Sequence, residues 1–201
     1  GYMYTSGQQH GNTTDSPIKD VLDSWYSSNL AGQADKISKE AGFCGDREMR
    51  TGYSWSSESS STIYYKAYER LYANKTPTLK CSNSADLYTV SGSSKGNKAL
   101  LNPVGLITAD EVSMAGGVWN TENSSYYLHI GNSFWTMTPC RFTLSSTYKL
   151  SLVFYLGSDG SLNNNGVNAS RGIRPVINLA SDVVLSGTGT ASDPYIVEGA
   201  E

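Results

Sequence analysis

Few residues in this 201-residue chain have the types and spacing that catalysis requires. Ser146 and Lys149 match the S-x-x-K pattern of penicillin-recognising enzymes, which places the serine at a helix start and needs a companion K-T-G motif. Here the pattern leads into an expected strand, and no K-T-G occurs. Of the two histidines, His129 lies on an expected strand and His10 in the polar N-terminal segment, so we interpret both as ordinary side chains. We therefore expect no catalytic residues and no enzymatic activity.

Metal coordination is equally poorly supported by the residues present. The segment that starts at Asp159 resembles an EF-hand loop, but Asn164 replaces the required glycine and Ser170 the required glutamate. We interpret this segment as a hairpin turn. Three cysteines without C-x-x-C spacing, together with two histidines, do not suggest a zinc site. The sequence predicts neither a metal nor a cofactor.

The three cysteines, Cys44, Cys81 and Cys140, permit one disulfide and one free thiol. Cys44 and Cys81 both lie near turn-rich segments of the first half, so we predict that these two are joined. Such a bond indicates an oxidising compartment. The alternative is three reduced, buried thiols in a cytosolic protein.

Charge and hydropathy argue against two kinds of interaction, with nucleic acid and across a membrane. Charged residues make up 16% of the chain and its net charge is -3, whereas nucleic-acid binding requires clustered Lys and Arg. No apolar run approaches the roughly 20 residues of a membrane span. We therefore predict neither nucleic acid as a partner nor a membrane span in this chain.

The composition between residues 121 and 174 is unusual. Lys, Glu, Gln, Met and Trp occur there only as Lys149, Glu122, Met137 and Trp135, while Asn, Ser, Tyr, Phe, Leu and Gly dominate. Tyr, Ser and Asn are preferred in binding surfaces, because Tyr supplies rigid contact area and Ser and Asn supply adaptable hydrogen bonds. The alternative interpretation is a β-sheet with aromatic cross-strand pairs and polar loops.

The helices that would support this region are expected mainly in the N-terminal half. Pro17 follows a capping Asp or Ser, and apolar residues then recur at helical spacing, which predicts a helix to about Leu30. A weaker pattern predicts a helix over residues 34–41. The sequence from Thr108 to Glu111 forms a capping box and predicts a third, short helix.

Strands are expected in the C-terminal half, over residues 126–130, 134–138, 150–156 and 173–179. Residues 183–184 and 195–197 are predicted to form a closing hairpin. No repeat and no linker divides the chain. The sequence therefore predicts one α+β domain over residues 1–201, with an antiparallel strand meander after the helices.

Several blocks resemble a family of bacterial surface proteins with a C-type lectin-like fold, often joined to pilin-like anchors. These blocks are GLITADEV (105–112), AGG (115–117), FWTMTP (134–139) and GIRPVINL (172–179). Three shorter segments near the N-terminus, at residues 1–4, 25–26 and 43–47, fit the same family, so the resemblance covers nearly the whole chain. It implies a C-type lectin-like fold and a position outside the cell, on the surface or on a pilus.

Some members of this group resemble variable proteins of diversity-generating retroelements. Such elements mutate template adenines, and Asn codons changed in this way cannot yield Lys, Glu, Gln, Met or Trp. These are the residue types depleted between 121 and 174, so the resemblance implies a variable, ligand-binding region there. Trp135 and Met137 lie in a signature block and would face inward, with Phe134 facing out, and Arg174 would be structural. The implied partner is an unidentified macromolecule, a protein or a cell-surface component, as for an adhesin.

The predicted ligand contacts are side chains of this region that strand alternation and turns would expose. They are Tyr127, His129, Asn132, Phe134, Cys140, Arg141, Phe142, Tyr148, Tyr155, Asn163, Asn165 and Asn168. Cys140 would be an exposed thiol. The calcium-dependent sugar motifs are absent, because Trp119-Asn120 is followed by Thr121, so neither calcium nor sugar binding is predicted.

Two other functions remain open from the sequence. One is a structural minor-pilin head without a variable site. The other is an enzyme similar to the formylglycine-generating type, which would need a reactive cysteine pair.

Overall fold

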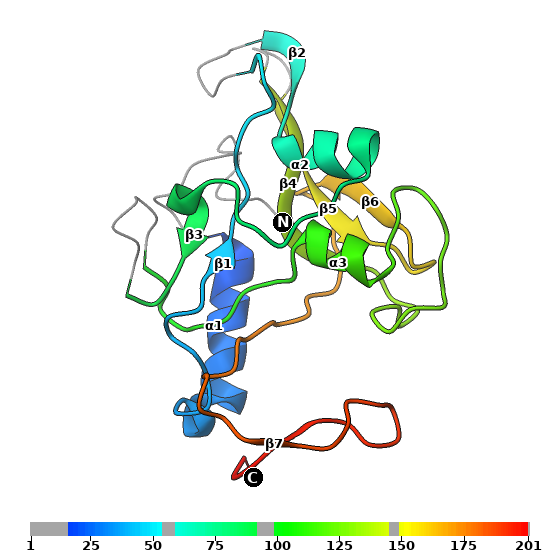
Figure 1. Cartoon of the computed structure of the whole chain (residues 1–201). Coiled ribbons are helices and arrows are strands. Elements are labelled where there is room, and N and C mark those ends of the chain that lie inside the picture. The colour runs from blue at the N-terminus through cyan, green and yellow to red at the C-terminus, as the bar shows by residue number, and fades with distance from the viewer. Residues whose placement is uncertain (1–15, 54–58, 92–98, 145–148, 201) are drawn as a thin grey trace.

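Helices and antiparallel strands are mixed along the chain, so the protein is α+β as predicted (Figure 1). The computed structural model describes residues 16–53, 59–91, 99–144 and 149–200. The helices are α1 (Pro17–Asn29), α2 (Lys66–Tyr68) continuing into the π-helical η2 (Glu69–Asn74), and α3 (Ala109–Ala115), with short 3-10 turns η1 (Ala31–Gln33) and η3 (Ser84–Asp86). The strands are β1 (Phe43–Cys44), β2 (Ser59–Tyr64), β3 (Leu87–Tyr88), β4 (Phe134–Leu144), β5 (Lys149–Leu156), β6 (Leu162–Gly166), β7 (Leu185–Ser186) and β8 (Ile196–Val197).

The central element is a four-stranded antiparallel sheet in the order β2-β4-β5-β6. The long strand β4 is irregular, because its pairing with β5 shifts register between Trp135 and Pro139 and again before Arg141. The hairpin of β5 and β6 is regular, and its register pairs Tyr155 with Asn163 and Val153 with Asn165. Two smaller sheets pair β1 with β3 and β7 with β8.

Two of the predicted helices are confirmed. Helix α1 begins at Pro17 and its last backbone turn closes at Leu30, whose N–H donates to the carbonyl of Tyr26. Helix α3 carries the expected capping box: the Thr108 hydroxyl accepts from the Glu111 N–H, and the Glu111 carboxylate accepts from the Thr108 N–H. The reciprocal bonds satisfy two backbone donors that would otherwise remain open at the helix start.

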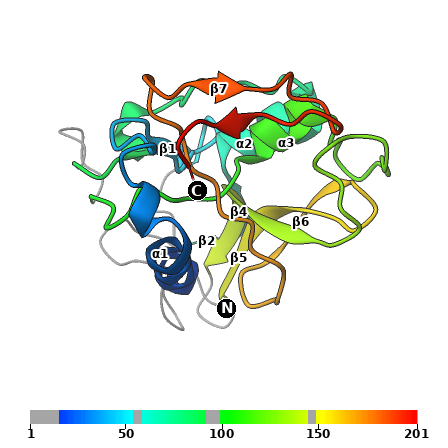
Figure 2. The ribbon, with the colours of Figure 1, turned by 90° about the horizontal axis from the view of Figure 1, so that it is seen from below.

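The sheet is covered on both faces, with α1 on one side and α2 and α3 on the other (Figure 2). Phe134, Phe154 and Leu162 belong to the apolar cluster beneath α2 and α3. Trp135 belongs instead to the cluster beneath α1. Because both faces of the sheet are packed, the side chains of a central strand are buried whichever face they point to. Few of them remain for contact with a ligand.

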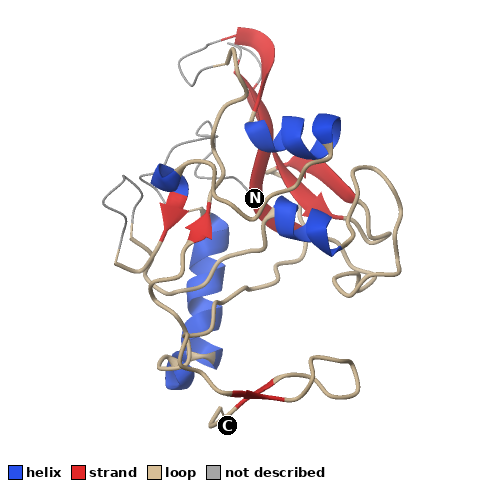
Figure 3. Cartoon of the chain, in the orientation of Figure 1, coloured by secondary structure: helices blue, strands red, loops and turns tan. Residues whose placement is uncertain are grey.

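The predicted strand over residues 126–130 is wrong, since this segment is a loop that folds against α3 and the β5–β6 turn. Strand β4 already has β2 and β5 as neighbours, so no free edge is left for another strand there. The loop is held by the Tyr126 hydroxyl, which donates to the Gly160 carbonyl at 2.8 Å, and by burial of Leu128. Figure 3 shows the long loops before β4 and after β6.

The predicted strand over residues 173–179 is also wrong as a continuous strand. Pro175 has no N–H and interrupts a ladder, and the segment instead makes isolated bridges, Val176 with Gly105 and Leu179 with Ile37. The same pairing explains why no helix forms over residues 34–41: the backbone at 36–38 bonds to residues 178–180 instead of to itself. The expected closing hairpin is present as β7 and β8, with its first strand two residues later than predicted.

Candidate functional site

The β5–β6 hairpin brings together three of the predicted contact residues. Residues paired across an antiparallel ladder point to the same face, so Tyr155 and Asn163 are neighbours, and Asn165 lies two residues further along β6 on that face. All three side chains are partly exposed. We call Tyr155, Asn163 and Asn165 the hairpin face. Asn168, which is exposed, lies just beyond the end of β6.

The turn that closes this hairpin is rigid for local reasons. The Asp159 carboxylate accepts hydrogen bonds from the N–H and the hydroxyl of Ser161, and these bonds lower the pKa of that carboxyl. Gly160 has a φ of 79°, which favours glycine. A side chain at Gly160 would collide with the backbone of Asn123, because a Cβ there would lie 1.8 Å from the Asn123 carbonyl oxygen. The turn therefore fixes where the hairpin face points.

Arg171 lies against the hairpin face from the segment that follows β6. Its guanidinium is 3.6 Å from the ring centroid of Tyr155 and 5.6 Å from that of Trp135. The two rings meet edge to face with centroids 6.0 Å apart. Such stacking leaves the N–H edge of a guanidinium free for an anion. The Nε of Arg171 is buried and has no hydrogen-bond partner among the described residues. One Nη donates to the Ser133 hydroxyl over a long distance of 3.4 Å.

A cavity of about 380 Å³ opens beside Arg171, between α1 and the sheet. Helix α1 contributes Ile18 and Leu22, and strands β4 and β5 contribute Trp135 and Val153. The remaining wall comes from the loops at residues 99–106 and 167–173 and from β1 and β3. Its size and mainly apolar lining are typical of a site for a small ligand.

The structure corrects three predicted contacts. Phe134, Cys140 and Phe142 are buried, with at most 1% of each residue exposed. Phe134 and Cys140 pack beneath α2 and α3, and Phe142 packs against Ile63 and Tyr65. They fail as surface residues because both faces of β4 are covered. The predicted outward position of Phe134 is therefore wrong, whereas the inward position of Trp135 is correct.

The remaining predicted contacts do not join the hairpin face. Tyr127 and Asn132 are exposed on the loop before β4, and His129 Nε2 of the same loop lies 2.9 Å from the Ser158 carbonyl oxygen. Arg141 lies on the opposite face of the sheet. Tyr148 falls outside the described residues.

The environments of Cys140 and Arg174 indicate structural roles. Burial raises the pKa of the Cys140 thiol to about 12, so this thiol is protonated and unreactive, not an exposed nucleophile. Arg174 donates to the Leu128 carbonyl at 3.1 Å and lies over the Phe134 ring, as expected for a residue that ties the last segment to its neighbours.

An aromatic ladder occupies the opposite side of the sheet. Tyr64 and Tyr68 have ring centroids 4.4 Å apart, Tyr68 stacks on Tyr72 at 4.9 Å, and Tyr72 meets Trp119 edge to face at 5.5 Å. Arg141 lies 6.0 Å from the Tyr64 ring centroid. Tyr64 and Tyr68 are partly buried, whereas Tyr72 remains exposed.

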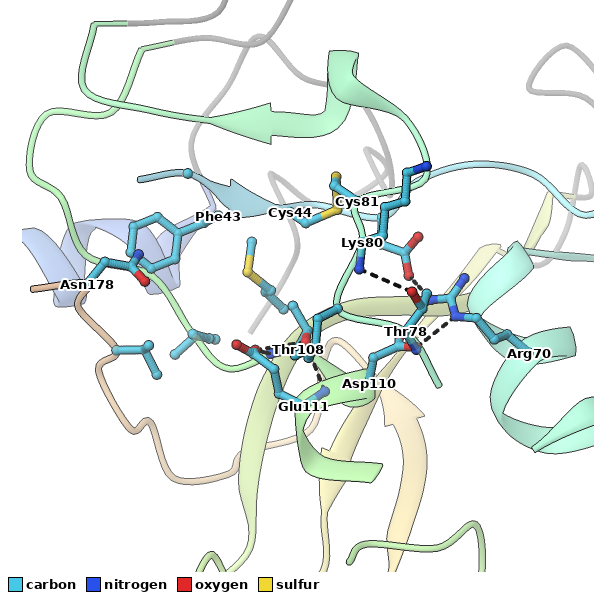
Figure 4. A pocket seen from close by; sticks show the side chains of 16 residues that line it. Phe43, Cys44, Arg70, Thr78, Lys80, Cys81, Thr108, Asp110, Glu111 and Asn178 are labelled. Carbon is cyan, nitrogen blue, oxygen red and sulfur yellow. Dashed lines mark hydrogen bonds and ion pairs between the residues drawn. A yellow bond between two sulfur atoms is a disulfide. The ribbon is translucent and has the colours of Figure 1, made fainter. Parts of the chain in front are cut away.

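A second hollow is built around a buried ion cluster (Figure 4). Arg70 of η2 donates to both oxygens of Asp110 at 2.7 and 2.6 Å and to Asp46 at 2.5 Å. Burial alone would lower the pKa of Arg70, but its bonds to both carboxylates raise it. Desolvation raises the pKa of Asp46 despite the neighbouring guanidinium.

This cluster fastens the loop of residues 75–83 to the rest of the fold. The Thr78 N–H donates to Asp110 at 2.8 Å, and the Ser82 hydroxyl donates to Asp46 at 3.3 Å. A disulfide joins Cys44 and Cys81, the pair that the sequence suggested, with Cα atoms 5.6 Å apart. All of these groups are satisfied by one another, which indicates a structural role.

The described residues contain no cluster of three or more His, Cys, Asp or Glu side chains that could hold a metal ion. Within the same ranges, no helix has the length and apolar character needed to span a membrane.

Sequence reasoning missed Arg171 and the cavity. Arg171 directly precedes the GIRPVINL block, and its position as a cation in a segment with few charged residues was the available signal. The cavity had no such signal, because α1 and the loop at residues 167–173 are distant in sequence.

Comparison with known proteins gave no relative: no protein-family model matches the chain, and no curated protein or solved structure matches it at a significant level.

Proposed function

We propose that this chain is a non-enzymatic ligand-binding module with a C-type lectin-like fold, similar to the variable proteins of diversity-generating retroelements. Its ligand contacts lie on the hairpin face, formed by Tyr155, Asn163 and Asn165. The observation that carries the proposal is the β5–β6 register, which gathers these side chains on one partly exposed surface within the region of biased composition.

The physical basis is the separation of this face from the packed residues of the same strands. Phe154 and Leu162 alternate with the hairpin face and are fully buried, so they anchor the hairpin from its other side. Of the hairpin-face residues, Tyr155 also packs at the edge of the cluster beneath α1. Substitution of partly exposed residues usually changes stability by little. A surface of Tyr and Asn can therefore be varied while the scaffold stays folded.

The proposed partner is a macromolecule, a protein or a cell-surface component, and the proposed location is extracellular, at the cell surface or on a pilus. The disulfide between Cys44 and Cys81 supports an oxidising compartment. It also leaves no second cysteine for the buried Cys140, which argues against a reactive pair of the formylglycine-generating type.

Sequencing of the parent locus tests the retroelement part of the proposal. We expect a near-identical template repeat, with differences confined to adenines opposite codons between 121 and 174, and a reverse-transcriptase gene nearby. A locus without either would refute it.

A structural minor-pilin head is the second candidate, and burial of Phe134, Cys140 and Phe142 favours it, since these residues leave a smaller surface for contact. In that case the parent locus would hold pilin-subunit genes and no template repeat. Replacement of Tyr155, the largest side chain of the hairpin face, would then affect assembly instead of ligand capture.

A further inference from the structure

The cavity beside the hairpin face combines an apolar wall with an unbalanced positive charge. Three cationic side chains, Lys19, Arg47 and Arg171, line it, and none of the described residues in the lining is Asp or Glu. A chamber with one sign of charge selects ligands of the opposite sign.

Two of these cations already have partners outside the cavity lining. Lys19 pairs with Asp23 one helical turn along α1. Arg47 pairs with Asp86, because its Nε at 2.9 Å and an Nη at 2.7 Å both donate to the Oδ1 of that carboxylate. Both charges are therefore neutralised within the fold.

Arg171 has no such partner. It forms no ion pair with any described carboxylate, its buried Nε has no hydrogen-bond partner among the described residues, and its contact with Ser133 is long. The stack on Tyr155 covers one face of the guanidinium and does not use its N–H groups as hydrogen-bond donors. A buried donor without a protein partner is destabilising unless water or a ligand satisfies it.

We propose that the cavity binds a small apolar monocarboxylate, with its carboxylate on the N–H edge of Arg171 and its apolar chain between α1 and the sheet. The two oxygens of a carboxylate match the parallel N–H groups of a guanidinium. A single charge fits because Arg171 is the one lining cation without a described carboxylate partner. Arg171 stacks on Tyr155 of the hairpin face, but the cavity lining contains none of the three hairpin-face residues, so small-ligand binding does not depend on the macromolecular ligand proposed above.

The apolar part of the ligand has a defined place. Ile18 and Leu22 of α1 form one wall, and Trp135, Val153 and Ile173 form the other. An aliphatic chain against these side chains is removed from water along its length, which favours binding in proportion to the area buried. The apolar walls of the cavity therefore favour a ligand with an aliphatic chain, and the positive charge of Arg171 favours a carboxylate head group.

The test is calorimetric titration of the full chain with decanoate, below the concentration at which decanoate forms micelles, and with decan-1-ol. We expect one saturable site for decanoate and binding of decan-1-ol that is about ten-fold to a hundred-fold weaker, since the alcohol lacks the charge-assisted hydrogen bonds. Absence of saturable binding, or equal binding of the two compounds, would overturn the proposal.

Two variants distinguish the role of Arg171 from the effect of removing one positive charge elsewhere on the protein. Arg171→Gln is expected to bind decanoate as weakly as the wild-type protein binds decan-1-ol. Arg50→Gln is the control, because Arg50 lies outside the cavity lining and pairs with Glu69 at 3.3 Å. Equal decanoate affinity in both variants would contradict the assignment.

A second measurement covers the case in which Arg171→Gln fails to fold. Decanoate labelled with ¹³C at the carboxyl carbon reports its own pKa through the chemical shift during a pH titration. Bound to the wild-type protein, the carboxyl is expected to titrate at lower pH than free decanoate, because the guanidinium favours its charged form. An unchanged pKa in the bound state would place the head group away from Arg171 and overturn the proposal.

Discussion

Replacement of Arg70 by Met should destabilise the protein more than loss of any exposed cation. Arg70 lies between two buried acidic residues, Asp46, which is 5% exposed, and Asp110, which is 3% exposed. The variant leaves two carboxylates buried close together without their counter-ion. Removal of one partner from a buried ion pair typically costs about 3–5 kcal/mol.

Urea unfolding under non-reducing conditions measures this loss. With an m-value of about 2 kcal/mol per molar urea, a loss of 4 kcal/mol would lower the unfolding midpoint by about 2 M. Arg50→Met is the matched control. The Arg50–Glu69 pair is 3.3 Å long with side chains 40% and 34% exposed, so its loss should cost less than about 1 kcal/mol.

A third variant isolates the cause. Combining Arg70→Met with Asp46→Asn and Asp110→Asn removes all three charges, and it should recover a large part of the stability lost in Arg70→Met alone. The reasoning is refuted if Arg70→Met shifts the midpoint no further than Arg50→Met, or if the triple variant is less stable than the single one.

Three further predictions concern the scaffold around the hairpin face. Cys140 should not react with a thiol reagent in the native protein at pH 8, and unfolding without reductant should expose one thiol per chain; a reactive native thiol would contradict its burial. Gly160→Ala should destabilise the protein by several kcal/mol in a thermal melt, whereas Gly131→Ala, which also has a positive φ but no atom within 4 Å of the added Cβ, should cost about 1 kcal/mol; equal costs would contradict the clash with Asn123. Burial raises the pKa of Tyr126 to about 12, above its usual 10, so the stability contributed by the neutral phenol is present below pH 10 and is lost as the pH rises from 10 to 12. Tyr126→Phe should lack that loss when the two proteins are unfolded by urea across this pH range, and parallel curves would contradict the assignment.

Local signals predicted the elements whose causes are local. The capping box at Thr108 and the Pro17 helix start both operate within one helical turn, and both helices form where expected. The Asp159–Gly160 turn is likewise determined by its own residues. Segments whose structure depends on distant partners were predicted poorly: residues 34–41 and 173–179 share bridges with each other and with Gly105, which no local pattern reveals.

The candidate site was predicted in part for the same reason. Composition pointed to the region, and strand register then selected Tyr155, Asn163 and Asn165 from it. Phe134 and Phe142 were misplaced because strand alternation assumes one solvent-exposed face, whereas this sheet is packed on both. Which faces of a sheet are covered depends on where the helices dock.

Randomisation of the hairpin face tests the central claim most directly. A displayed library varied at Tyr155, Asn163 and Asn165 should remain folded in most clones and should yield specific binders when selected against a fixed panel of soluble proteins. A library of equal size varied at the buried Phe134, Cys140 and Phe142 should be mostly unfolded and yield none. If the hairpin-face library is as poorly folded as the buried one, or folds but gives no binder, the hairpin face is not an exchangeable binding surface.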